Sequence, residues 1–131
     1  MIVPGEGGLA CGTEGPGRLP EPREIYSIIS DMLARKDLGA LKIMVTAGPT
    51  VEPIDPVRFI SNRSSGKMGY ALAAAARRRG ADVVLISGPT SLDRPCGVEY
   101  IPVQTAEEMR TEVLARSDGC DIVIKAAAVS D

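Results

Sequence analysis

Residues 61–69 read Ser-Asn-Arg-Ser-Ser-Gly-Lys-Met-Gly, and their types are suited to binding an anion. They lie just before an alanine-rich segment that has the pattern of a helix. Hydroxyls, backbone N–H groups and a lysine at a helix start attract an anion, and the helix dipole adds to the attraction. The stretch is not a Walker A motif, because Ser61 stands where that motif needs a glycine and Met68 follows Lys67. A phosphate site is the chemical interpretation.

The same stretch has a purely structural interpretation. Ser64 or Ser65 would be the N-cap of the following helix, Gly66 a turn residue and Lys67 a solvated charge. Taken alone, the nine residues favour neither interpretation, so the rest of the chain has to decide between them.

Composition excludes several classes of function. Lys plus Arg number 15 against 17 for Asp plus Glu, so a net charge of −2 gives no sign of nucleic-acid or membrane binding. The absence of histidine excludes Ser-His and Cys-His nucleophile pairs and any His-ligated metal. Cys11, Cys96 and Cys120 lack CxxC spacing, which argues against a disulfide framework or a zinc site. With no apolar run near the ~20 residues of a membrane span, we expect a cytoplasmic protein.

The beginning of the chain is rich in glycine and proline. Residues 1–22 therefore predict a loop, either a flexible tail or a mobile flap. Residues 22–36 predict an amphipathic helix that has Pro22 in its first turn and is ended by Gly39. Its apolar stripe is Ile25, Ile28, Ile29, Met32 and Leu33.

From residue 41 onward, apolar strands alternate with helices. The predicted strands are 41–46, 82–87, 98–101 and 121–126. Residues 51–60 contain two prolines and predict an irregular connection. A helix should begin with a capping box at Thr105 and run to about Arg116, with Met109 and Val113 facing inward. Another helix should cover residues 65–79 and be closed by Gly80. Its inward face should be Met68, Ala71, Leu72, Ala75 and Ala76. This pattern predicts an α/β, Rossmann-like parallel sheet with helices on both faces.

Such sheets bind ligands beyond the carboxyl ends of their strands. Residues 46–50, 87–90 and 126–131 all follow strands at that edge, and Gly-Pro-Thr occurs at 48–50 and again at 88–90. Their gathering favours the phosphate interpretation of residues 61–69. The dinucleotide fingerprint G-x-G-x-x-G is absent after the first strand, which disfavours a nicotinamide dehydrogenase. The residues alone indicate a nucleotide-like or phosphorylated ligand.

Longer motifs carry a resemblance. Residues 45–50, 52–62, 64–69 and 126–131 strongly resemble the phosphopantothenate-cysteine ligase domain of bifunctional coenzyme A biosynthesis proteins. The Ala-Cys-Gly at 10–12, Gly-Pro-Gly-Arg at 15–18 and Glu-Pro at 21–22 are similar to the substrate flap of their FMN-dependent phosphopantothenoylcysteine decarboxylase half. The resemblance implies that residues 1–39 are the C-terminal tail of the decarboxylase domain, and residues 40–131 the N-terminal part of the ligase domain.

In that family, CTP activates the 4'-phosphopantothenate carboxylate as an acyl cytidylate, and the cysteine amine then forms the amide. The resemblance implies CTP and Mg2+, with Mg2+ on triphosphate oxygens rather than on protein ligands, and FMN only for the decarboxylase half. It also implies small-molecule substrates and a homo-oligomer of the intact protein. We expect the chain as given to be at best a partial nucleotide-binding domain.

The resemblance also assigns roles to residues. Asn62 would orient and polarise the activated acyl group, Arg58 would face substrate charge, and Cys11 would donate a proton in the decarboxylase. The nucleotide or substrate would contact Gly48, Ser61, Ser65, Gly66, Lys67, Met68, Ala126, Ala127, Ala128 and Asp131.

Plainer interpretations stay open. Asn62 could be a turn residue, Arg58 a surface charge and Asp131 a residue without a role, while Cys96 and Cys120 are interpreted as small apolar residues. Two other functions also stay open: the flavin-dependent decarboxylase, and a Rossmann-like binding module without catalysis.

Overall fold

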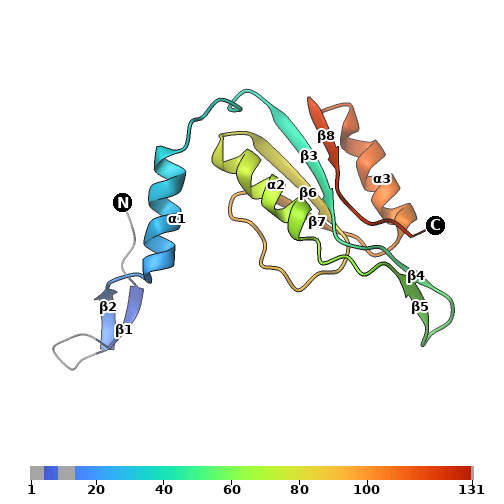
Figure 1. Ribbon diagram of the computed structural model, residues 1–131, viewed down its shortest axis with the longest axis horizontal. Coiled ribbons are helices and arrows are strands. Elements are labelled where there is room, and N and C mark those ends of the chain that lie inside the picture. The colour runs from blue at the N-terminus through green and yellow to red at the C-terminus, as the bar shows by residue number, and fades with distance from the viewer. Residues whose placement is uncertain (1–4, 9–13, 131) are drawn as a thin grey trace. The chain divides into compact units, whose positions relative to one another are not determined.

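The computed structural model describes residues 5–8 and 14–130 and divides the chain into two compact units, Met1–Arg35 and Lys36–Asp131. Figure 1 labels the elements of both units. The domain boundary predicted from the sequence, between residues 39 and 40, stays a prediction. The assignment of the first unit to a decarboxylase stays a prediction.

The first unit contains a hairpin and a helix. Strands β1 (Gly5–Gly8) and β2 (Glu14–Arg18) pair antiparallel, so the prediction of a loop without regular structure was wrong for these residues. Pro16 lies within β2, opposite Glu6 of β1. Helix α1 (Pro22–Leu33) has Pro22 in its first turn, as expected. It ends earlier than the predicted Lys36, because the backbone becomes extended at Ala34.

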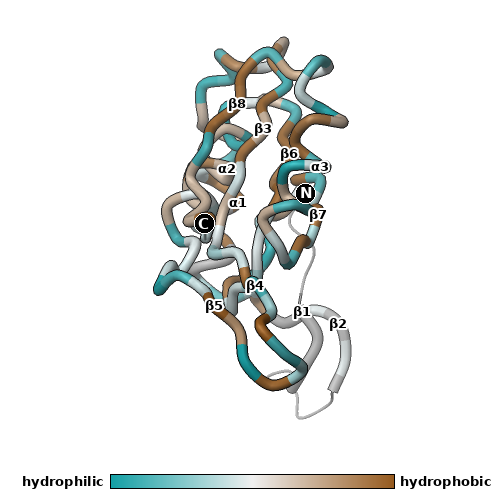
Figure 2. The backbone as a smooth tube through the Cα atoms, turned by 90° about the vertical axis from the view of Figure 1, so that its right-hand side faces the viewer, coloured by the Kyte–Doolittle hydropathy of each residue, from teal (hydrophilic) through white to brown (hydrophobic). Residues whose placement is uncertain are grey.

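The second unit is built on a parallel sheet, as predicted. Its strands are β3 (Lys42–Ala47), β6 (Asp82–Ser87), β7 (Glu99–Pro102) and β8 (Ile122–Lys125), in the order β7-β6-β3-β8. The central pair β3 and β6 is buried almost throughout. Figure 2 shows hydrophobic stretches along these strands. Burial on both faces explains why they read as continuous apolar runs rather than as an alternating pattern.

Helices α2 (Lys67–Arg78) and α3 (Ala106–Ser117) cover opposite faces of the sheet (Figure 1). On one face, Val45 and Leu85 pack in a core with Ala73 of α2. On the other face, Met44 packs in a second core with Met109 of α3. The α/β fold with helices on both faces is therefore confirmed.

The inward face of α2 differs from the prediction. Of the five residues predicted to face inward, Ala76 is buried, whereas Met68, Ala71, Leu72 and Ala75 are exposed. The other buried residues of the helix are Gly69, Tyr70 and Ala73. Packing distance explains the difference, because a Cβ atom placed on Gly69 would lie 2.5 Å from the Cβ of Ala47. At Gly69 no larger side chain fits between the helix and β3, and this close approach sets which face of α2 turns inward.

The connection between β3 and α2 is also more regular than expected. It contains β4 (Val51–Pro53) and β5 (Phe59–Ser61), which pair antiparallel with Val51 opposite Ser61. The prolines that suggested irregularity lie at the end of β4 and in the turn. Large apolar side chains on this hairpin are exposed, namely Ile54, Val57, Phe59 and Ile60.

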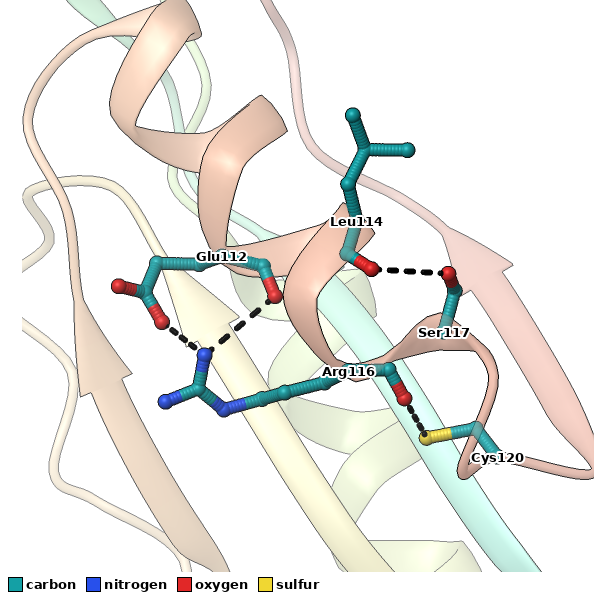
Figure 3. Close-up of polar contacts among 5 residues, drawn as sticks. All are labelled: Glu112, Leu114, Arg116, Ser117 and Cys120. Carbon is teal, nitrogen blue, oxygen red and sulfur yellow. Dashed lines mark hydrogen bonds and ion pairs between the residues drawn. The ribbon is translucent and has the colours of Figure 1, made fainter.

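Helix α3 has the predicted capping box. The Thr105 side chain accepts a hydrogen bond from the Glu108 N–H, and the Glu108 carboxylate accepts one from the Thr105 N–H. Figure 3 shows the other end, where the Arg116 guanidinium contacts the Glu112 carboxylate and the Cys120 thiol lies 3.3 Å from the Arg116 carbonyl oxygen. Cys120 is partly buried against the core, as expected of a small apolar residue, whereas Cys96 is exposed.

No helix within residues 5–8 and 14–130 is long and apolar enough to cross a membrane.

Candidate functional site at the carboxyl edge of the sheet

The strand order places a topological switch point between β3 and β8. The chain proceeds from β3 outward to β6 and β7, and then returns to β8 on the other side of β3. In open parallel sheets, ligands bind outside the carboxyl ends of the strands at such a point. The segments that follow β3 and β8 are residues 48–50 and 126–130, so two of the predicted loops flank the switch point.

These two loops are held together by backbone hydrogen bonds. The Ala128 N–H donates to the Gly48 carbonyl at 2.8 Å, and the Thr50 N–H donates to the Ala128 carbonyl at 3.2 Å. Pro49 and Ala128 form a parallel bridge, and the Ala127 N–H lies 3.3 Å from the Thr46 hydroxyl. The structure therefore brings Gly48 together with the Ala126 to Ala128 stretch in one surface.

Thr50 joins three segments at this edge, although the prediction did not include it. Its side chain is completely buried, and its hydroxyl accepts a hydrogen bond from the Ser130 N–H at 2.9 Å. Its carbonyl accepts one from the Ser61 hydroxyl at 2.7 Å. The repeated Gly-Pro-Thr was the sequence signal that could have identified Thr50. The Ser61 hydroxyl, which was predicted to contact the ligand, thus also stabilises this edge through its hydrogen bond to Thr50.

Asn62 holds the loop that follows β8. Its amide nitrogen donates to the carbonyl oxygens of Ala128 at 3.2 Å and Val129 at 3.1 Å, and it lies 3.4 Å from the Ser130 hydroxyl. An amide nitrogen has two protons, and three acceptors of this loop lie within hydrogen-bond distance of it. Donation from Asn62 to a substrate would require an exchange of these bonds. Its carbonyl oxygen can accept a hydrogen bond without such an exchange.

The start of α2 presents backbone N–H groups at the same edge. The Tyr70 N–H makes the hydrogen bond to the Gly66 carbonyl, so the N–H groups of Lys67, Met68 and Gly69 precede the repeating hydrogen bonds of the helix. The first turn carries no acidic residue and the helix has no side-chain cap. Such a helix start favours an anion through its free N–H groups and its dipole.

The N-cap of α2 is Gly66, with φ of 74°, rather than Ser64 or Ser65. The Ser64 hydroxyl accepts a hydrogen bond from the Gly66 N–H at 3.3 Å, which supports the turn before the helix. Ser65, Lys67 and Met68 are exposed. The structural interpretation of the serines as caps was wrong. The left-handed backbone at Gly66 is instead a reason for glycine at this position.

The α2 start touches the turn after β3. Gly48 also has a left-handed backbone, with φ of 73°, and a Cβ atom placed on Gly66 would lie 3.3 Å from the Gly48 Cα. Gly88, in the turn after β6, approaches more closely still: a Cβ atom on it would lie 1.6 Å from the Pro49 oxygen. The backbones of these turns therefore approach each other closely, and the glycines leave no room for side chains of their own.

A tyrosine pair lies beneath the turn after β6. The Thr90 hydroxyl donates to the Tyr70 hydroxyl at 3.0 Å, and Tyr70 donates to Tyr100 at 3.4 Å. Burial by itself raises the pKa of Tyr70, whereas hydrogen bonds with Ser87, Thr90 and Tyr100 lower it. The lowering effects are together larger, so the pKa of Tyr70 lies below its ordinary value. The pKa of Tyr100 is raised by burial and by Tyr70, and the Arg94 guanidinium lies 4.4 Å from its ring centre.

A cleft of about 350 Å³ opens beside this edge, at the ends of β6 and β7. Its lining includes Ser87, Gly88, Pro89, Tyr100, Gln104 and Glu108. Within the described residues, no group of three His, Cys, Asp or Glu side chains could hold a metal ion.

The remaining predicted site residues are Arg58, Cys11 and Asp131. Arg58 is in the β4–β5 turn, 72% exposed, with its Nε 2.7 Å from the Asp55 carboxylate. At about 3.3 Å per residue, it is separated from Asn62 by roughly 13 Å of chain. Cys11 and Asp131 are outside the described residues.

The second unit matches a known family along nearly its whole length. Residues 38–131 match the family described as the DNA/pantothenate metabolism flavoprotein C-terminal domain. The chain belongs to this family.

Relatives of this chain include the coenzyme A biosynthesis bifunctional protein CoaBC of Bacillus subtilis strain 168. It is 55% identical over an alignment of 135 positions, which covers 100% of this chain and 33% of the relative. CoaBC of Escherichia coli K12 is 52% identical over 129 residues, 98% of this chain and 32% of the relative. The chain thus spans about a third of the length of these relatives.

A solved structure supports the fold. The crystal structure of the C-terminal domain of a CoaBC protein matches with a TM-score of 0.69 and 51% sequence identity. The match covers 72% of this chain and 48% of that domain.

Proposed function

We propose that this chain carries the carboxyl-edge nucleotide site of a ligase that joins 4'-phosphopantothenate to cysteine at the expense of CTP. The observation that carries the proposal is the assembly of two loops at the switch point with the start of α2, held by Asn62. Family membership and the relatives named for coenzyme A biosynthesis support the choice of substrates.

In the proposed reaction, a carboxylate oxygen of 4'-phosphopantothenate attacks the α-phosphorus of CTP. Pyrophosphate leaves, and the acyl cytidylate remains. The amine of cysteine then attacks the acyl carbon, CMP leaves, and the amine proton is lost to solvent or to a base. Both steps depend on positioning and on stabilisation of negative charge, which backbone N–H groups provide without a titratable side chain.

Different residues of this chain would bind the phosphates and position the substrate in this reaction. The N–H groups at the start of α2 would face the phosphates, and the exposed Lys67 ammonium would add a mobile positive charge. Asn62 would fix the loop 126–130 in place and offer its carbonyl oxygen to the substrate. Mg2+ would enter as the CTP complex and would be held by triphosphate oxygens.

The experiment measures binding of CTP and of ATP, each with Mg2+, by isothermal titration calorimetry. We expect the chain to bind CTP more tightly than ATP, and Lys67→Ala to weaken CTP binding about three- to tenfold through loss of one charge. Lys42→Ala is the matched control, because Lys42 is at the opposite, amino end of β3.

Asn62→Ala removes the hydrogen bonds to the loop 126–130, and we expect it to weaken CTP binding more than Lys67→Ala does. Equal affinity for CTP and ATP would argue against the cytidine assignment. Equal weakening by Lys42→Ala and Lys67→Ala would mean that the phosphates do not bind at the start of α2.

A further inference from the structure

Thr90 lies between the turn after β3 and the start of α2. A Cβ atom placed on Gly66 would be 2.8 Å from the Thr90 methyl carbon, and one placed on Gly48 would be 3.0 Å from the same carbon. The methyl group therefore occupies the space beside both glycines, where their own side chains would have been. One methyl group thus lies beside both of the backbone segments that border the proposed phosphate site.

The hydroxyl of the same side chain has a different set of partners. It donates to the Tyr70 hydroxyl at 3.0 Å, and the Leu92 N–H lies 3.4 Å from it. Tyr70 is only 6% exposed and belongs to the first turns of α2. A β-branched side chain has few χ1 rotamers, so a hydroxyl held in this way also sets the direction of the methyl.

We propose that Thr90 is a positioning residue for the anion site, and that its methyl group is the part that acts. By filling the contact between Gly48 and Gly66, the methyl sets how closely the β3 turn approaches α2. That approach fixes the directions of the N–H groups of Lys67, Met68 and Gly69. The inference rests on the proposed function, because it assumes that these N–H groups face phosphate.

Two substitutions separate the methyl from the hydroxyl. Thr90→Val keeps the methyl against the glycines and removes the hydroxyl, whereas Thr90→Ser keeps the hydroxyl and removes the methyl. The probes are inorganic pyrophosphate with Mg2+ and CTP with Mg2+, titrated calorimetrically into the full chain. We expect Thr90→Ser to weaken both ligands about five- to tenfold through lost preorganisation, and Thr90→Val to stay within about twofold of the parent.

A second readout follows the backbone directly. Amide hydrogen exchange at Gly66 to Gly69 should speed up in Thr90→Ser and stay unchanged in Thr90→Val, while exchange in β6 stays the same in both. A general loss of stability would instead speed up exchange in β6 as well. This readout needs no ligand, so it tests the placement of the methyl even in a chain that binds no nucleotide.

The outcomes distinguish the two proposals. Pyrophosphate binding without preference for CTP over ATP would refute the ligase assignment and leave the role of Thr90 standing. Affinity and exchange that are equal in Thr90→Ser and the parent would overturn the role of Thr90 whatever the nucleotide preference. Equal weakening in Thr90→Val and Thr90→Ser would also overturn it, because the methyl would not be the acting group.

Discussion

Replacing Gly88 by alanine should destabilise the second unit strongly. The new Cβ atom would lie 1.6 Å from the Pro49 oxygen and 2.7 Å from the Pro49 carbonyl carbon. The first distance is about 1.5 to 2 Å shorter than non-bonded heavy atoms tolerate. Because both atoms belong to the backbone, no rotamer change can relieve the contact, and the turns after β3 and β6 have to separate.

The magnitude follows from what that separation breaks. Overpacking of this kind costs about 1–3 kcal/mol. The Gly88 N–H also donates to the Ala47 carbonyl at 3.0 Å, and losing such a hydrogen bond adds about 1 kcal/mol. We therefore expect a loss of about 2–4 kcal/mol, a large fraction of the 5–15 kcal/mol that is typical of a domain.

The assay is urea unfolding followed by circular dichroism at a helical wavelength. Gly39→Ala is the control, because a Cβ atom there would lie 3.6 Å from its nearest neighbour, an ordinary contact. The control should change the free energy of unfolding by no more than about 0.5–1 kcal/mol. A loss below about 1 kcal/mol for Gly88→Ala would refute the reasoning, since it would mean that these turns separate easily.

Two further predictions concern local features. Thr105→Ala should cost about 1 kcal/mol of unfolding free energy because it removes half of the capping box of α3, whereas Thr105→Ser keeps the cap; equal losses in the two variants would contradict this. The pKa of Asp55 lies below its ordinary value of 3.8, chiefly because its carboxylate accepts hydrogen bonds from the Val57 and Arg58 N–H groups and then from the Arg58 side chain. A depressed pKa means that the stabilising contribution is present above pH 3.8 and is lost as the pH falls through the lower folded value. NMR titration of the Asp55 carboxyl should show that low midpoint, and Asp55→Asn should abolish the corresponding acid-dependent part of stability; a midpoint at 3.8 or above would show that the turn does not hold the carboxylate.

The features that the sequence predicted correctly depend mainly on neighbouring residues. Continuous apolar runs predicted β3 and β6, because both faces of these strands are buried. The Thr105 to Glu108 spacing predicted the cap of α3, since a capping box joins residues three positions apart. Strand alternation with helices also predicted the edge at which the loops gather.

The features that were missed depend on contacts between distant residues. Which face of α2 turns inward was decided by Gly69 against Ala47, a contact set by how close the helix lies to the sheet. The Asn62 amide reaches the Ala128 carbonyl, 66 positions further along the chain. The local pattern of apolar residues predicts neither the contact of α2 with β3 nor the hydrogen bond from Asn62 to the loop after β8.

By itself, the sequence determined how the four strands of the parallel sheet alternate with α2 and α3 along the chain, the cap of α3 and the edge where small residues collect. Each of these features follows from the spacing of nearby residues or from the burial of a whole strand. Only the tertiary structure decided that Thr50 joins three segments, that Asn62 donates to the loop after β8, and that the Thr90 methyl lies between two glycines. These contacts depend on the distances between segments that are far apart in the sequence. Packing of the helices and loops against the sheet determines those distances.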